Sequence, residues 1–360
     1  RFDREMTDVF AIQDEISQAI VEKLRVRLAA DRPLVKRHTE SVEAYHLFLR
    51  GRHCIYRLTQ EWLAKGKEHL EQAIALDPNY ALAYAGIAEY YFLCTFWGFM
   101  DPKEALPKSK SAAIEALRLD DTLAEAHSIL GVVLGNGDFD WAGAEREFRR
   151  ALELNPVSPI VRYYYGFLFL RSLGRLDEAL PQIQRAAELD PLSALYNMLL
   201  AHLHFVRGQY DLAIALYKRA MDLDPGYYFP HWTAAVAYAH MGRFEEATSE
   251  AQKACELSGR NMLTLGVLGL AYGLAGRRSE ARALLEELTT RHRTAYVPPF
   301  PMAAIYLGLG EVDHALEWLD KSVEERDLIV VGSLKSEPAY IPLHGHPRYS
   351  ALLRKMNVEP

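Results

Sequence analysis

The chain has 360 residues, of which 50% are hydrophobic and 25% are charged. These proportions are those of an ordinary folded protein and exclude a disordered or collagen-like chain. The 41 Lys and Arg residues and 48 Asp and Glu residues give a net charge of −7, which argues against an extensive nucleic-acid-binding surface. Three widely separated cysteines, Cys54, Cys94 and Cys255, form neither a disulfide framework nor a CxxC metal pair.

The first forty residues differ in pattern from the rest of the chain. Five aliphatic side chains recur there at helical spacing: Val9, Ile12, Ile16, Ile20 and Leu24. This spacing predicts an amphipathic helix near residues 9–29. A lone helix of this length is marginal in water, so we expect its apolar face to dock on the helices that follow or on a second chain, forming a homodimer. The chain starts with Arg rather than Met, and we expect it to be part of a longer protein.

From residue 42 onward one pattern returns repeatedly. Variants of the string ALDP recur at steps of 43, 35, 35, 34 and 34 residues, ending at Pro78, Asp121, Pro156, Pro191, Pro225 and Gly259. Each unit also contains a Gly-bearing turn and then two small residues seven apart, such as Ala213 and Ala220. Because seven residues are two helical turns, both small side chains lie on one helix face, where a second helix can approach. The pattern predicts eight helix pairs, near residues 42–77, 80–120, 122–155, 158–190, 192–224, 227–258, 261–291 and 299–326.

Two units depart from this pattern. The loop around residues 95–102 in the second unit is about nine residues longer than in the others, because the step there is 43 rather than 34. The turn of the third unit contains the unusual run Gly135–Trp141. After the last unit, a short helix around Tyr349, Leu352, Leu353 and Met356 is expected to cap the array, since terminal repeats otherwise expose an apolar face.

The recurring 34-residue helix–turn–helix resembles the tetratricopeptide repeat (TPR) over about residues 42–330. This resemblance implies an all-α, right-handed superhelical solenoid of about eight helix hairpins, with an extra N-terminal helix and a C-terminal capping helix. The opening run RFDREMTDVFAIQDEI resembles the end of the TolB-like domain that precedes TPR arrays in some bacterial signalling proteins. We therefore expect residues 1–40 to be the remnant of such a domain and a linker, 41–330 the TPR array, and 331–360 the cap.

Signatures of catalysis and of cofactor binding are missing from the sequence. It has no phosphate-binding GxxxxGK[ST] loop, and the glycines of Gly266–Gly276 suit close helix packing better than GxGxxG. HExxH, GxSxG and kinase signatures are also absent. The pair His344 and His346, and the pair Asp138 and Asp140, are more typical of solvated loops and turns than of metal sites. We expect no enzyme activity, no cofactor and no metal.

The candidate binding surface is the concave side, which the resemblance assigns to the first helix of each pair. Counting from the small residues of the fourth to sixth units places aromatic and apolar side chains there, together with two histidines. The predicted partner-binding residues are Tyr163, Phe167, Met198, His202, Phe205, Phe229, Trp232, Val236 and His240. Such side chains often anchor protein interfaces. The alternative is that they pack on neighbouring repeats and fill the superhelix themselves.

The functional expectation follows from the resemblance. It implies a non-catalytic scaffold or regulatory arm of a larger bacterial signalling protein, of the kind linked to a cyclase, a kinase or a winged-helix domain. The partner would be a protein or peptide, with no nucleic acid bound by this region. A peptide or small-molecule sensor, with its ligand in the aromatic groove, is the first alternative, and an unrecognised enzyme is the second. The longest uncharged stretch is too short for a membrane span, and we expect a cytoplasmic location, with an extracytoplasmic or periplasmic one as the alternative.

Overall fold

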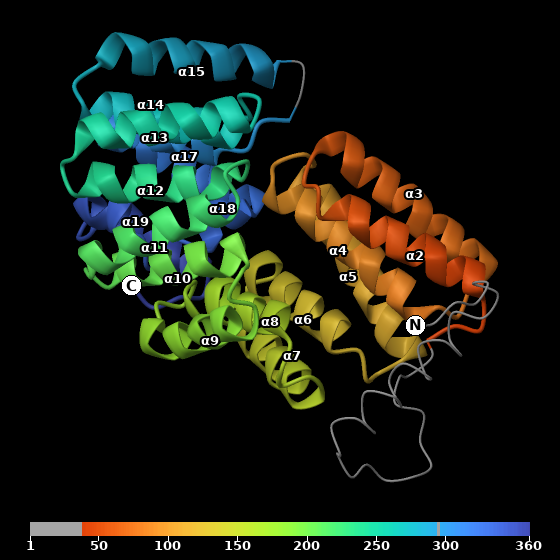
Figure 1. The fold of residues 1–360 in the computed structure, drawn as a ribbon. Coiled ribbons are helices and arrows are strands. Elements are labelled where there is room, and N and C mark those ends of the chain that lie inside the picture. Colours follow the sequence, from red (N-terminus) through yellow and green to blue (C-terminus); the bar gives the residue numbers. More distant parts are fainter. Residues whose placement is uncertain (1–37, 294–295) are drawn as a thin grey trace.

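The computed structural model describes residues 38–293 and 296–360, and in these ranges it contains helices and turns without a β-strand. The helices form consecutive antiparallel pairs (Figure 1). The first four pairs are α2 (Val42–Ile55) with α3 (Gln60–Leu76), α4 (Ala81–Phe96) with α5 (Pro102–Leu119), α6 (Ala124–Val132) with α7 (Trp141–Leu154), and α8 (Pro159–Tyr163) with α9 (Leu176–Leu189). Helices α6 and α8 continue into the π-helical segments η1 (Val133–Gly137) and η2 (Tyr164–Leu170). The last four pairs are α10 (Ala194–Val206) with α11 (Tyr210–Leu223), α12 (Tyr228–His240) with α13 (Phe244–Leu257), α14 (Met262–Leu274) with α15 (Arg278–His292), and α16 (Phe300–Gly308) with α17 (Val312–Glu325). The eight predicted helix pairs are confirmed. The helix predicted near residues 9–29 lies outside the described residues.

Small side chains set the close approach of the two helices in each pair. Ala213 and Ala220 of α11, for example, are completely buried. Where the small residue is Ser109, its hydroxyl donates a hydrogen bond of 2.8 Å to the backbone oxygen of Ala88 in the partner helix. A larger side chain at such a position would force the two helices apart.

The turns inside the pairs need a left-handed residue. Gly208 and Gly242 have φ angles of +77° and +73°, a conformation that costs glycine little and other residues more. This is why the Gly-bearing turn recurs with the repeat.

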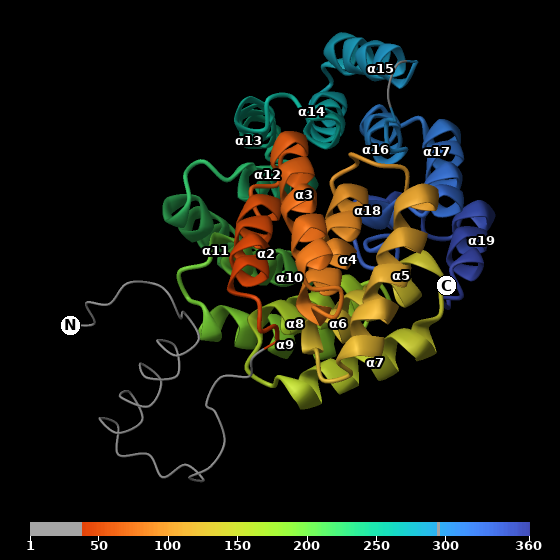
Figure 2. The same ribbon diagram turned by 90° about the vertical axis from the view of Figure 1, so that its right-hand side faces the viewer.

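The first helices of neighbouring pairs pack side by side along the inner face of the curve. The second helices α11, α13 and α15 lie on its outside (Figure 2). After α17 the chain continues through α18 (Leu328–Val331), the 3₁₀ helix η3 (Pro338–Leu343) and α19 (Pro347–Lys355). The predicted capping helix is confirmed as α19, which buries Leu352 and Leu353, with Met356 buried directly after it.

The C-terminal region also reaches back to the third unit. The indole Nε1 of Trp141 donates a hydrogen bond of 2.6 Å to the backbone oxygen of Met356. The Arg326 Nε donates one of 2.7 Å to the backbone oxygen of Gly137, and its guanidinium lies 4.0 Å from the centre of the Phe139 ring. The unusual turn of the third unit is therefore a contact with the C-terminal end of the array.

The long loop of the second unit makes a similar contact. The Trp97 ring lies 5.2 Å from the Phe229 ring and 5.8 Å from the Tyr228 ring, both of α12. Next to it, a Cβ added to Gly98 would lie 2.5 Å from the Pro298 Cγ, so the loop fits closely against the segment before α16. Both departures from the repeat pattern join early units to late ones.

Candidate functional site

The nine predicted groove residues divide into two groups. Five of them line one cavity: Phe167, His202, Phe229, Trp232 and Val236. The others lie outside its lining: Tyr163, Met198 and Phe205 are buried in the helix packing, whereas His240 is exposed. The first helices of the fourth, fifth and sixth units thus bring five of the nine predicted residues together around one cavity.

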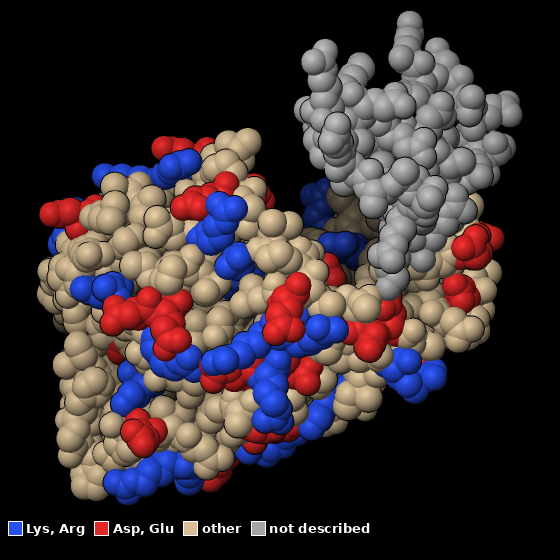
Figure 3. All heavy atoms as spheres, turned by 90° about the horizontal axis from the view of Figure 1, so that it is seen from below, with Lys and Arg blue, Asp and Glu red and all other residues tan. Residues whose placement is uncertain are grey.

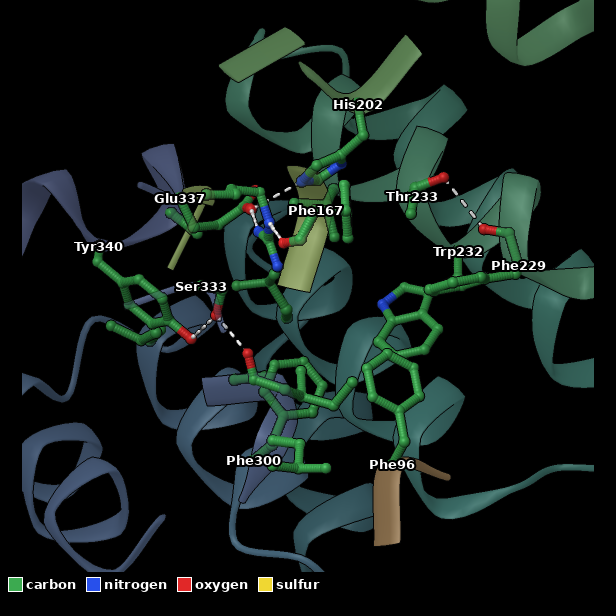
Figure 4. Close-up of a pocket in the computed structure, with 18 residues that line it drawn as sticks. Phe96, Phe167, His202, Phe229, Trp232, Thr233, Phe300, Ser333, Glu337 and Tyr340 are labelled. Atoms are coloured by element: carbon green, nitrogen blue, oxygen red, sulfur yellow. Dashed lines mark hydrogen bonds and ion pairs between the residues drawn. The ribbon is translucent and has the colours of Figure 1, made fainter. Parts of the chain in front are cut away.

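The C-terminal region covers this cavity. Leu328 and Ile329 of α18 line it, and Ser333 and Tyr340, further along the chain, lie on the other side of the cavity from Trp232 (Figure 4). The cavity measures about 90 Å³, smaller than the engineered cavity of about 150 Å³ that admits benzene. Trp232 and Phe167 are each only 5% exposed. The concave side of these units is therefore largely filled by the chain itself.

One wall of the cavity is polar. The Glu337 Oε2 lies 2.9 Å from the His202 Nε2 and 3.5 Å from the Arg171 Nη1. Burial alone would raise the pKa of Glu337, but His202 and Arg171 hold it below its usual range. Burial lowers the pKa of Arg171, whose guanidinium also lies 4.2 Å from the centre of the Phe167 ring. The three side chains form a compact buried cluster that joins the fourth and fifth units to the C-terminal region.

Sequence reasoning predicted His202 at this site but missed Glu337. Glu337 lies 166 residues from Arg171 and 135 from His202, in a segment without the repeat pattern. No local signal connects it to them, because only the return of the C-terminal chain brings the three together.

A second, smaller pocket lies on the concave side of the first four units. It measures about 50 Å³ and contains Glu89 and Glu125. The Glu89 Oε1 accepts hydrogen bonds from the hydroxyls of Tyr56, at 2.9 Å, and Tyr164, at 3.1 Å. Sequence reasoning missed this site, although Glu89 is the one charged residue in the helix Ala81–Phe96.

Metal binding would require a group of metal-ligating side chains in the described part of the chain, and thiol chemistry would require a reactive cysteine there. No three His, Cys, Asp or Glu side chains are grouped there so as to hold a metal ion. All three cysteines are free and buried, and burial raises the pKa of Cys94 to about 11, which opposes thiolate reactivity. Among the described helices, none is both long and apolar enough to cross a membrane.

The fold defines a helical-repeat protein with pockets on its concave side. Family models of the tetratricopeptide repeat match residues 170–228, 206–254 and 262–301. The described chain is therefore a TPR array, as the sequence pattern predicted. The human IFIT1 dimer with m7Gppp-AAAA has a similar fold, with a TM-score of 0.61 and 16% identity over 96% of this chain and 77% of IFIT1. At this identity the likeness concerns the fold alone.

Two bacterial relatives match part of the sequence. The transcriptional regulator HilA of Salmonella typhimurium is 32% identical over 155 residues, which are 43% of this chain and 28% of HilA. The putative adenylate cyclase 3 of Rhizobium meliloti is 30% identical over 139 residues, 37% of this chain and 23% of the relative. The chain thus spans less than a third of the length of each relative.

Proposed function

We propose that the chain is a non-catalytic interaction or regulatory arm of a larger bacterial signalling protein. The TPR fold implies binding of a protein or peptide. The relatives are named for different activities, transcriptional regulation and cyclase activity, and a shared repeat array accounts for binding more readily than for either activity. In this proposal residues 1–40 belong to an upstream domain and linker, 41–330 form the array and 331–360 the cap. A homodimer through the helix near 9–29 and a cytoplasmic location stay predictions.

The partner site in this proposal is the concave side of the fourth to sixth units. The observation that carries it is the convergence of five of the nine predicted side chains on one cavity. Because Trp232 and Phe167 are buried behind the C-terminal region, a protein partner would first contact the rim, where Val236 and the exposed His240 lie. Phe205 supports the rim from within, because its ring centre lies 5.7 Å from that of His240.

A small-molecule sensor is the second candidate. The apolar cavity with its polar wall of Arg171, His202 and Glu337 favours it, because ligand sites combine apolar walls with a few placed polar groups. The cavity of about 90 Å³ would take only a very small ligand unless the C-terminal region moved.

Nucleic acid is not part of the proposal. The structure of IFIT1 includes a capped oligonucleotide, m7Gppp-AAAA, but phosphate backbones require several cationic side chains. The cavity here has Arg171 as its one Lys or Arg side chain among the described residues. On the face shown in Figure 3, positive and negative side chains alternate without a continuous basic patch.

Site-specific photo-cross-linking in bacterial cells tests the proposal. A photoreactive residue would replace His240 or Val236 at the concave rim, and Leu212, an exposed residue of the outer helix α11, in the control. Adducts to a defined protein from the two rim positions alone would support the proposed face. Adducts from Leu212 alone would place binding on the outside of the array. The purified chain should convert no ATP to cyclic AMP.

A further inference from the structure

We propose that the concave side of the first four units binds the positively charged side chain of a partner peptide, a lysine or an arginine, at Glu89. This site is separate from the cavity of the fourth to sixth units, so an experiment can contradict one of the two proposals without contradicting the other.

Glu89 is a buried carboxylate with half of its hydrogen-bonding capacity in use. It projects from α4 and is 8% exposed. Its Oε1 accepts from Tyr56 at the end of α2 and from Tyr164 at the start of η2. Within the described ranges its Oε2 accepts no hydrogen bond, and Glu89 lines the pocket. A buried carboxylate is strongly stabilised by a donor, and a ligand can supply one here.

The charges around the pocket favour a cation. Glu125 of α6 lines the same pocket and interacts electrostatically with Arg52. Arg52 is the positive group nearby: it interacts electrostatically with Glu89 and Glu125, while its guanidinium lies 5.7 Å from the ring centres of Phe48 and Tyr56. With both carboxylates ionised, two negative charges face one positive charge.

The size of the pocket selects a side-chain head group. About 50 Å³ is far below the 300–1,000 Å³ of typical small-molecule sites. Apolar side chains, Leu82, Ile129 and Ile160, line the pocket beside the carboxylates. Lysine and arginine have apolar stems below their charged heads, so either matches a pocket with an acidic floor and apolar walls. Four consecutive units contribute to the pocket, and an extended peptide can run along them.

The protonation of Glu89 should also make peptide binding depend on pH. Burial raises the pKa of Glu89, while Arg52 and the hydroxyls of Tyr56 and Tyr164 oppose that rise. With Glu125, these are the titratable and charged groups that face it from α2, α4, α6 and η2. A cationic head binds the ionised carboxylate, so affinity should increase as the pH rises through the pKa of Glu89. Lysine and arginine stay charged throughout that range.

The test uses the 360-residue chain and an array of acetylated pentapeptides with randomised flanks. The central residue is lysine, arginine, acetyl-lysine, norleucine or glutamate. Binding to the best lysine or arginine peptides should be at least tenfold tighter than to their acetyl-lysine and norleucine counterparts, measured by NMR titration. Equal binding of the uncharged counterparts would overturn the proposal without any variant of the protein.

Three variants then locate the site. Glu89→Gln, which can still accept from both tyrosines, should weaken lysine-peptide binding at least tenfold at an unchanged melting temperature. Glu245→Gln, at an exposed position of α13, should leave binding unchanged. Arg52→Gln should tighten binding severalfold, because it removes the competing cation. Undiminished binding to Glu89→Gln would contradict the proposed site. Equal affinity for n-butylammonium would show that a free amine, rather than a peptide, is the ligand.

Discussion

The concave side has two regions that each contain a buried carboxylate, and the two regions stabilise that carboxylate with different partners. In the fourth to sixth units, the C-terminal region lies against the aromatic side chains, and Glu337 pairs with Arg171 and His202. In the first four units, Glu89 uses two tyrosine hydroxyls and keeps one oxygen free of described partners. The same repeat geometry therefore gives a region that the C-terminal chain covers, called the filled region, and one that it does not cover, called the open region, although the pocket of the filled region is the larger, at about 90 Å³ against about 50 Å³. The difference lies in whether the C-terminal part of the chain covers the concave side chains of the region.

The comparison also explains where the array departs from its repeat. The loop of the second unit contacts α12 through Trp97, and the turn of the third unit contacts the C-terminal region through Phe139. A solenoid in which each unit contacts only its neighbours needs no such features. Here they hold distant units together, so we expect the filled region to unfold as one cooperative block.

Tyr340→Ala should have the largest effect. Tyr340 is 3% exposed and packs in the cavity wall, and truncating a buried aromatic residue costs about 4 kcal/mol. The free energy of unfolding should decrease by this amount in a denaturant titration. Hydrogen exchange should accelerate in η1, η2 and α10, with α2 and α3 little changed. Equal acceleration in α2 and α3 would show that the two regions are not independent.

Arg171→Met should be the next most damaging substitution. It leaves Glu337 with His202 as its remaining hydrogen-bond partner among the described residues, and breaking a buried ion pair costs about 3 to 4 kcal/mol. The double variant Arg171→Met with Glu337→Leu should recover most of the loss, since no buried charge remains unpaired. A double variant as unstable as the single one would mean that Arg171 stabilises the region by packing alone.

Asp327, the residue at the N-terminus of α18, makes the filled region pH-dependent. Burial raises the pKa of its carboxyl to about 6, although the backbone N–H groups of Phe300 and Ile329 donate to it. The unfolded chain has the ordinary value near 3.9, so the folded state binds the proton more tightly. Folding stability should therefore decrease as the pH rises from about 4 to 6, by up to about 3 kcal/mol at 1.36 kcal/mol per pKa unit.

Asp327→Asn tests this dependence, because the amide does not titrate. Its single oxygen can accept from only one of the two backbone N–H groups, so the variant should be less stable than the unchanged chain at pH 4 and should lose the slope between pH 4 and 6. Asp313→Asn, at an exposed position of α17, is the matched control and should keep the slope. A slope retained in Asp327→Asn would assign it to another group.

The sequence predicted the helix pairs because their determinants are local and repeated. Ala213 and Ala220, seven residues apart, and the turn at Gly208 can be recognised without knowing the fold. The return of the C-terminal chain could not be predicted, because Trp141 and Met356 are 215 residues apart and a single sequence gives no signal for such a pair. For the groove, counting from the small residues selected Phe167, His202 and Trp232, which line one cavity. It could not show that Glu337 would cover them.

Trp141→Phe addresses the link between the third unit and the C-terminal end, and its effect should be the smallest. The phenyl ring keeps much of the packing, while the hydrogen bond from the indole to the backbone oxygen of Met356 is lost. Such a bond contributes about 1 kcal/mol, so the melting temperature should decrease by a few degrees. Trp62→Phe is the control, because Trp62 is 37% exposed on α3 of the open region, and it should change little. If the two variants have the same melting temperature, the hydrogen bond between Trp141 and Met356 does not stabilise the contact between the third unit and the C-terminal end. The packing of Phe139 and Arg326 must then hold the two together.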